Sequence, residues 1–77
     1  LNQGDAAASI LIEISNSEIA IKRVEATQML GLLVEKHRSQ ISEHTVELIR
    51  QTMSQRLYDN DQNVKRFATQ SLQKIKD

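Results

Sequence analysis

Apolar residues recur at helical spacing in four segments of the chain, and short polar stretches separate these segments. In the last segment, five apolar residues form one stripe because residues three or four apart share a face of a helix. These residues are Val64, Phe67, Ala68, Leu72 and Ile75. Asp59, Asn60 and Asp61 precede the stripe, and their side chains can accept hydrogen bonds from the free N–H groups of a first helical turn. The segment therefore predicts a capped, amphipathic helix.

The whole pattern predicts four helices, at about residues 6–15, 18–37, 42–58 and 61–76. Asp5 is the expected N-cap of the first helix and Ser42 that of the third. The second helix has an apolar face made of Ile19, Ala26, Met29, Leu30 and Leu33. The third has a core stripe made of Val46, Ile49, Met53 and Leu57. We expect an all-α fold, since no segment shows the alternation of a strand.

The first predicted helix is apolar around most of its circumference, through Ile10, Leu11, Ile12 and Ile14. A helix of this kind is normally buried on more than one side. We expect its open flank to be covered by a preceding helix pair or by another copy of the chain, so self-association through this helix is predicted. The chain begins with Leu1 rather than Met, and we expect it to be a fragment or a processed chain.

An internal repeat links the second and fourth predicted helices. The tripeptide Ala-Thr-Gln occurs at residues 26–28 and again at residues 68–70, and apolar residues follow it at the same spacing. Arg23 and Lys65 match across the same offset of 42 residues. A chain of 77 residues forms one domain at most. We therefore predict one helical domain, residues 1–77, with repeat units at about 5–38 and 41–77.

The fourth segment resembles the second helix of a HEAT repeat, a family related to armadillo repeats, which often reads Asp-x-Asp-x-x-Val-Arg-x-x-Ala-x-x-x-Leu-Gly-x-Leu. The matching positions are Asp59, Asp61, Val64, Lys65, Ala68, Leu72 and Ile75. Lysine replaces the arginine at position 65, and Gln73 replaces the glycine. The earlier unit matches through Arg23, Ala26, Leu30, Gly31 and Leu33 but departs at Lys22.

The resemblance implies two stacked antiparallel helix pairs, as in a fragment of an α-solenoid at the C-terminal end of a longer array. The armadillo variant adds a short helix to each unit, for which this chain has little room. A compact four-helix bundle is the alternative fold.

HEAT-like arrays commonly bind partners through the concave surface that their second helices line, and this implies a candidate surface here. In the first unit it comprises Val24, Thr27, Gln28, Gly31 and Glu35. In the second unit it comprises Arg66, Thr69, Gln70 and Gln73. Both Thr-Gln pairs are predicted to face outward. Gly31 is either a tolerated surface glycine or a point of close approach by a neighbouring backbone or partner. We expect a non-catalytic scaffold module that binds a protein or peptide.

Nucleic-acid binding is the alternative function, with Lys22, Arg23, Lys65 and Arg66 contacting phosphates. Ten basic and ten acidic residues give the chain a formal net charge of zero, which argues against a strong phosphate-binding surface. Only two residues are aromatic, Tyr58 and Phe67, too few for a platform that stacks bases.

The sequence shows no pattern of a catalytic, cofactor or membrane-spanning site. No serine lies in a nucleophile-elbow motif, and no cysteine is present. His37 and His44 flank one turn, where Glu43 could complete a metal site, but two solvated histidines are the simpler interpretation. No apolar run approaches the ~20 residues needed to cross a bilayer. We expect no enzyme activity, no cofactor and no membrane partner, and an intracellular location.

Overall fold

A computed structural model describes residues 3–75, which form four α-helices and one short 3-10 helix and contain no strand. The helices are α1 (Gln3–Ile14), α2 (Ala20–Lys36), η1 (Arg38–Gln40), α3 (Glu43–Arg56) and α4 (Gln62–Ile75). The predicted all-α fold is confirmed. The predicted boundaries are correct to within three residues, except that the end expected near Lys76 lies outside the described residues.

Two of the predicted N-caps are confirmed by their hydrogen bonds. The Ser42 hydroxyl accepts a bond from the Thr45 N–H at 3.2 Å, at the start of α3. The Asp61 carboxylate accepts bonds from the N–H groups of Asn63 and Val64, at 2.8 and 3.1 Å. Both side chains therefore satisfy backbone donors that a helix start leaves free.

The prediction that Asp5 is an N-cap is wrong. The helix α1 already includes Gln3, so Asp5 lies within its first turn. Its carboxylate instead accepts a hydrogen bond of 2.9 Å from the Ser42 N–H, at the start of α3. This bond lowers the pKa of Asp5 below its ordinary value. A short-range prediction missed it because the two residues are far apart in sequence.

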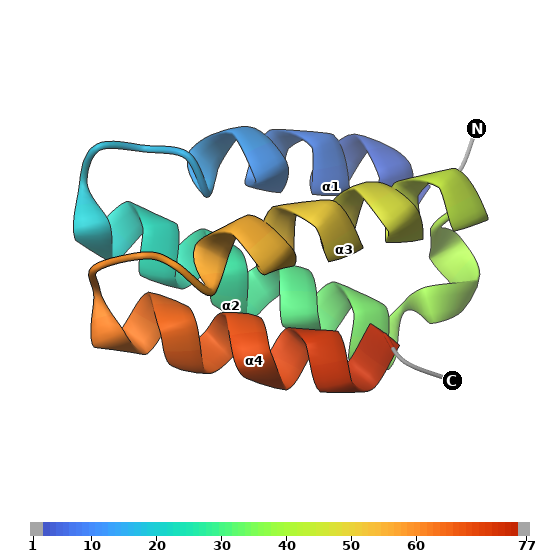
Figure 1. The fold of residues 1–77 in the computed structure, drawn as a ribbon. Helices are drawn as coiled ribbons and strands as arrows, with labels where there is room; N and C mark the ends of the chain where they lie inside the picture. The colour runs from blue at the N-terminus through green and yellow to red at the C-terminus, as the bar shows by residue number, and fades with distance from the viewer. Residues whose placement is uncertain (1–2, 76–77) are drawn as a thin grey trace.

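The four helices form two layers, one of α1 beside α3 and the other of α2 beside α4 (Figure 1). Successive helices run in opposite directions, so the two helices of each layer are parallel (Figure 1). The hairpin α1–α2 packs against the hairpin α3–α4, mainly through α2 and α4. Within residues 3–75, α1 and α4 make no close backbone approach.

The core lies between the layers and contains residues from all four helices and from the turn after η1. Its buried members are Ala8, Leu30, Val34, Ile41, Val46, Ile49, Met53, Ala68 and Ile75. The third predicted stripe is confirmed for Val46, Ile49 and Met53. The apolar face predicted for the second helix is partly wrong, because Ile19 and Met29 are 51% and 52% exposed.

The helices α2 and α4 approach each other closely at Gly31. A methyl group added there would overlap the Ser71 hydroxyl of α4. Thr27, one turn earlier on α2, is fully buried. The prediction that Thr27 and Gly31 face outward is therefore wrong, since both lie on the side of α2 that α4 covers. Of the two interpretations of Gly31, the structure supports close approach, and the neighbour is a side chain of α4.

Candidate protein-binding surfaces

A buried ion-pair cluster joins the two hairpins at the end where their connecting loops lie. Arg23 on α2 binds Asp59 with two hydrogen bonds, Nε to Oδ2 at 2.8 Å and Nη2 to Oδ1 at 3.1 Å. The side chains of Arg23 and Asp59 are only 13% and 5% exposed. Arg56 lies 3.6 Å from the same carboxylate and donates a bond of 2.9 Å to the Ser15 carbonyl. Asp59 therefore connects elements of both hairpins.

The cluster keeps Asp59 ionised. Burial alone would raise the pKa of Asp59, but hydrogen bonds from Arg23 and from the Asp61 N–H oppose it, as do the charges of Arg23 and Arg56. The net effect holds the pKa of Asp59 below its ordinary value. Asp59 was expected to cap the fourth helix, but its main partner is an arginine of the other hairpin.

The cluster also limits the predicted phosphate-binding set. The Arg23 guanidinium donates to Asp59 and to the carbonyls of Ser17 and Glu18, at 3.0 and 3.2 Å. Its donors are therefore directed inward, and Arg23 is not free to bind a phosphate. A nucleic-acid surface could still use the other three predicted phosphate-binding residues, Lys22, Lys65 and Arg66.

A shallow groove of about 80 Å³ follows the outer seam between α2 and α4. Its outward-facing walls are Gln28 and Leu32 on α2 and Phe67, Gln70 and Lys74 on α4. Leu32 is 44% exposed, so the groove offers apolar surface as well as the carboxamides of Gln28 and Gln70.

Two charged contacts border this groove. The Arg66 guanidinium lies 5.3 Å from the centre of the Phe67 ring, within the range of a cation–π interaction. Lys74 Nζ lies 3.0 Å from Glu35 Oε1, and this hydrogen bond lowers the pKa of Glu35. The pair Lys74–Glu35 bridges α4 and α2, whereas the exposed Arg66 donates a hydrogen bond of 3.1 Å to Asn63 Oδ1 on its own helix.

The structure brings together some of the predicted partner-binding residues and separates others. Gln28 and Gln70 line the same groove, with Arg66 and Glu35 beside it. Val24 is half-buried, while Thr69 and Gln73 are exposed but do not line the groove. Whether these exposed residues bind a partner stays a prediction.

Sequence reasoning missed four lining residues of the groove, Leu32, Phe67, Ser71 and Lys74. Two of them, Leu32 and Lys74, are related by the same 42-residue offset that relates Gln28 to Gln70.

The neutral chain has two layers of opposite charge. The helices α1 and α3 carry four acidic and two basic residues, a net charge of −2. The helices α2 and α4 carry six basic and two acidic residues, a net charge of +4. Composition alone could not show this separation, because the charges of the two layers and of their connections add up to zero for the whole chain.

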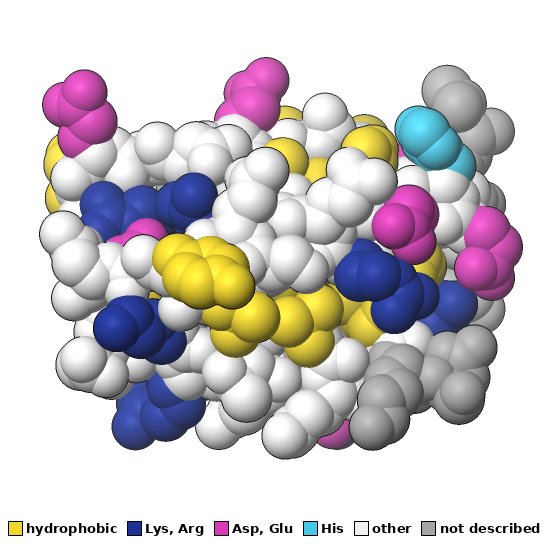
Figure 2. Space-filling model, viewed as in Figure 1, with side chains coloured by type: hydrophobic (Ala, Val, Ile, Leu, Met, Phe, Trp, Pro, Cys, Tyr) yellow, Lys and Arg dark blue, Asp and Glu magenta, His cyan; other side chains and the backbone are white. Residues whose placement is uncertain are grey.

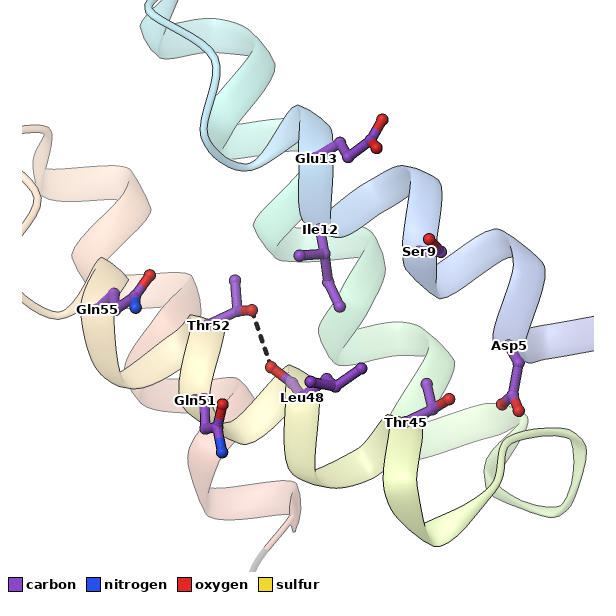
Figure 3. Close-up of a pocket in the computed structure, with 9 residues that line it drawn as sticks. All are labelled: Asp5, Ser9, Ile12, Glu13, Thr45, Leu48, Gln51, Thr52 and Gln55. Carbon is purple, nitrogen blue, oxygen red and sulfur yellow. Dashed lines mark hydrogen bonds between the residues drawn. The ribbon is translucent and has the colours of Figure 1, made fainter.

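A second groove, of about 270 Å³, lies between α1 and α3 (Figure 3). Ile12 on α1 and Leu48 on α3 point into the space between the helices, while Glu13 points outward from the rim (Figure 3). The remaining lining residues are polar: Asp5, Ser9, Thr45, Gln51, Thr52 and Gln55. None of these residues was predicted as part of a site, because each helix supplies only one wall.

The outer side of the first hairpin is apolar. A third groove, also of about 270 Å³, lies between α1 and α2 and is lined by Ala7, Leu11, Met29, Leu32, Leu33 and His37. On α1, Ile10 and Ile14 are 59% and 37% exposed, so the open flank predicted for the first helix is present. Self-association through that flank stays a prediction.

The outer side of the second hairpin also carries apolar side chains, along the seam between α3 and α4 (Figure 2). Leu57 and Leu72 are only partly buried against the core, and Tyr58 is 88% exposed. Both ends of the stack therefore offer some apolar surface.

Within residues 3–75, no group of three or more His, Cys, Asp or Glu side chains is placed to hold a metal ion. His37 and His44 are both exposed. Among the described helices, none combines the length and the hydrophobicity that crossing a membrane requires.

Comparison of the chain with protein-family models, with curated proteins and with solved structures gives no match. The fold and these surfaces are therefore the basis on which a function is proposed.

Proposed function

We propose that this chain is a non-catalytic interaction module of the HEAT-like repeat type, which binds a protein or peptide partner through the outer face of α2 and α4. Two observations support the repeat architecture. The two hairpins pack side by side with α2 parallel to α4 (Figure 1). Arg23 of the first unit also pairs with Asp59 of the second, so a buried ion pair joins the two units.

The order of neighbours favours stacked hairpins over a closed four-helix bundle. In an up-down-up-down bundle, the short connections place the first helix beside both the second and the fourth. Here α2 is the main neighbour of α4, while α1 and α4 make no close approach within the described residues. Each unit therefore has one helix in each layer, as stacked repeats require.

The observation that carries the binding proposal is the pairing of Gln28 and Gln70 in one groove. A carboxamide both donates and accepts hydrogen bonds, so each glutamine can bind a peptide group of a partner. Leu32 and Phe67 add apolar surface to the same groove, and Arg66 adds an exposed cation beside it. Such a mixture of aliphatic, aromatic, amide and arginine groups is typical of protein–protein interfaces.

The net positive charge of α2 and α4 is the one observation that favours the alternative, a nucleic-acid surface. Two of the six basic side chains, Arg23 and Lys74, are already in ion pairs. Glu25 and Glu35 lie on the same layer and oppose a phosphate backbone. A nucleic-acid surface would show affinity that falls steeply with salt concentration, whereas a protein surface with apolar contacts depends on salt much less.

The double variant Arg66→Ala/Gln70→Ala tests the proposed face. We expect it to weaken partner binding about tenfold or more, because it removes a hydrogen-bonding side chain from the groove and an arginine from its border. Both side chains are exposed, so the thermal midpoint should change little. The control is Arg50→Ala/Ser54→Ala on α3. Unchanged affinity in a calorimetric titration of the first variant would refute this surface.

A further inference from the structure

The α1–α3 groove lies where the two helices pack less closely than α2 and α4 do. In the α2–α4 layer, Gly31 lets the Ser71 side chain pack against the helix backbone. In the α1–α3 layer, the facing side chains between the two walls include the small residues Ser9, Thr45 and Thr52. The tight contact on one side and the small side chains on the other leave about 270 Å³ of open space.

The groove has an apolar floor. Ile12 is only partly buried against the core, and Leu48 is 40% exposed. The Thr52 hydroxyl donates to the Leu48 carbonyl at 2.8 Å, so its hydrogen-bonding capacity is directed to its own helix and not to the groove (Figure 3). An apolar side chain inserted here would cover surface that the chain itself leaves exposed.

The rim of the groove is acidic. Asp5 and Glu13 lie along the α1 wall, and Gln51 and Gln55 lie along the α3 wall. The described lining residues include no lysine, arginine or histidine. The two arginines of α3 are engaged elsewhere, Arg50 with Glu47 at 3.1 Å and Arg56 with Asp59 at 3.6 Å. The Asp5 carboxylate is partly compensated by its bond from the Ser42 N–H, so Glu13, which forms no ion pair within residues 3–75, carries the negative charge that this rim offers to a ligand.

We propose that this groove docks a cationic, amphipathic segment of a partner protein, with an apolar side chain over Ile12 and Leu48 and a lysine or arginine beside Glu13. Asp5 and Glu13 are eight residues apart, which corresponds to about 12 Å of helix, so the site matches roughly two turns of a bound helix. The groove lies on the layer opposite the α2–α4 face and has the opposite charge, so the module would have two sites for partners of different chemistry.

Two synthetic twelve-residue peptides test the charge of the preferred ligand. One has leucine at every third or fourth position with arginine between, and the other has glutamate in place of each arginine. In a titration followed by amide chemical shifts of the ¹⁵N-labelled chain, we expect the arginine peptide to cause saturable shifts at Ser9, Ile12, Glu13, Leu48 and Thr52. The glutamate peptide should leave these signals unchanged.

Three variants test the position of the site. Glu13→Gln should weaken binding of the arginine peptide about two- to fivefold, as expected for one exposed charge pair. Ser9→Phe, which fills the groove from an exposed position on α1, should abolish the saturable shifts. The control Glu47→Gln removes a carboxylate already paired with Arg50, and should change the affinity less than twofold.

Several outcomes would overturn the proposal. They are an absence of saturable shifts, equal binding of both peptides, and shifts that map to α2 and α4 or to the apolar α1–α2 groove. Normal binding by a folded Ser9→Phe variant would do the same. The proposed function concerns the α2–α4 face, which lies on other helices. It is tested separately by the variant Arg66→Ala/Gln70→Ala, whatever the outcome for the α1–α3 groove.

Discussion

Asp59 is a buried carboxylate that three donors hold: two hydrogen bonds come from Arg23, and one of 2.9 Å comes from the Asp61 N–H. An aspartate whose pKa is lowered by folding stabilises the folded state above its unfolded pKa of about 3.9. This contribution is lost as the pH falls through the lower pKa of the folded state. Asp5 and Glu35 have lowered pKa values as well and act in the same direction.

The variant Asp59→Asn should therefore lose stability in a pH-dependent way. At pH 7 we expect its free energy of unfolding to fall by roughly 2–3 kcal/mol, because a buried charge-assisted pair is broken and Arg23 is left without its counter-ion. As the pH falls below about 4, the difference between the variant and the parent chain should narrow, since the parent then loses the same charge. Urea denaturation at pH 7, 5, 3 and 2 measures this difference. A difference that stays constant over the whole range would contradict the assignment.

Thr27 carries a hydroxyl that is buried without a hydrogen-bond partner among residues 3–75. Removing such a group while keeping the shape of the side chain relieves a desolvation cost. We expect Thr27→Val to raise the free energy of unfolding by about 1 kcal/mol. Both residues are β-branched, so their helix propensities are similar.

The matched control for this substitution is Thr69→Val, at the equivalent position of the second unit. Thr69 is exposed, and its hydroxyl donates to the Lys65 carbonyl at 2.9 Å. Its substitution should change stability by no more than about 0.5 kcal/mol. If Thr27→Val destabilised the chain as much as a core truncation, the hydroxyl would have a partner that the described contacts do not include.

At the scale of the helices, the contact between α2 and α4 is the main contact between the two hairpins. Gly31 allows the Ser71 side chain to pack against the α2 backbone. A large side chain at this position would have to push α4 away or distort both helices. We expect Gly31→Leu to lower the free energy of unfolding by about 2–3 kcal/mol, in spite of the higher helix propensity of leucine.

The control for Gly31→Leu is Gln28→Leu, three residues earlier on the exposed side of α2. It introduces the same side chain at an exposed position on the rim of the α2–α4 groove, where the side chain can turn toward solvent, so we expect a change within about 0.5 kcal/mol. The thermal unfolding midpoints of both variants can be measured by following circular dichroism during heating. Equal stability of the two variants would mean that α2 and α4 do not approach each other at Gly31.

The sequence predicted the helices well because their signals are local. Ser42 and Asp61 mark helix starts by hydrogen bonds that span two or three residues. Apolar spacing likewise placed Val46, Ile49 and Met53 in the core. Such features depend on neighbouring residues, so they can be predicted before the packing of the helices is known.

The side on which each helix meets its neighbours could not be predicted in the same way. Thr27 and Gly31 look like surface residues in a helical projection, yet they are buried because α4 packs on them. Met29 looks like a core residue but is half exposed. The α1–α3 groove is harder still, since its two walls come from segments more than thirty residues apart. Predicting these features requires the arrangement of the layers, which helical periodicity does not give.

For the whole molecule, the separation of charge between the layers is the property that composition hides. The α2–α4 layer is positive and the α1–α3 layer is negative. Each layer has a groove with apolar surface, and the two proposed sites would hold partners of different chemistry on opposite sides. This arrangement suits a scaffold, whose function is to hold other molecules rather than to transform them.

Site-specific photo-crosslinking tests most directly whether α2 and α4 form the partner-binding face. A photoreactive amino acid is introduced at Gln28 or Gln70 in the α2–α4 groove, and at Ser54 on α3 as the control; all three side chains are exposed. We expect adducts with the same protein from Gln28 and Gln70, none from Ser54, and a large reduction when Arg66→Ala is combined with the probe at Gln28. Adducts that form from Ser54 as efficiently as from Gln70, or that are insensitive to Arg66→Ala, would show that this face is not where the partner binds.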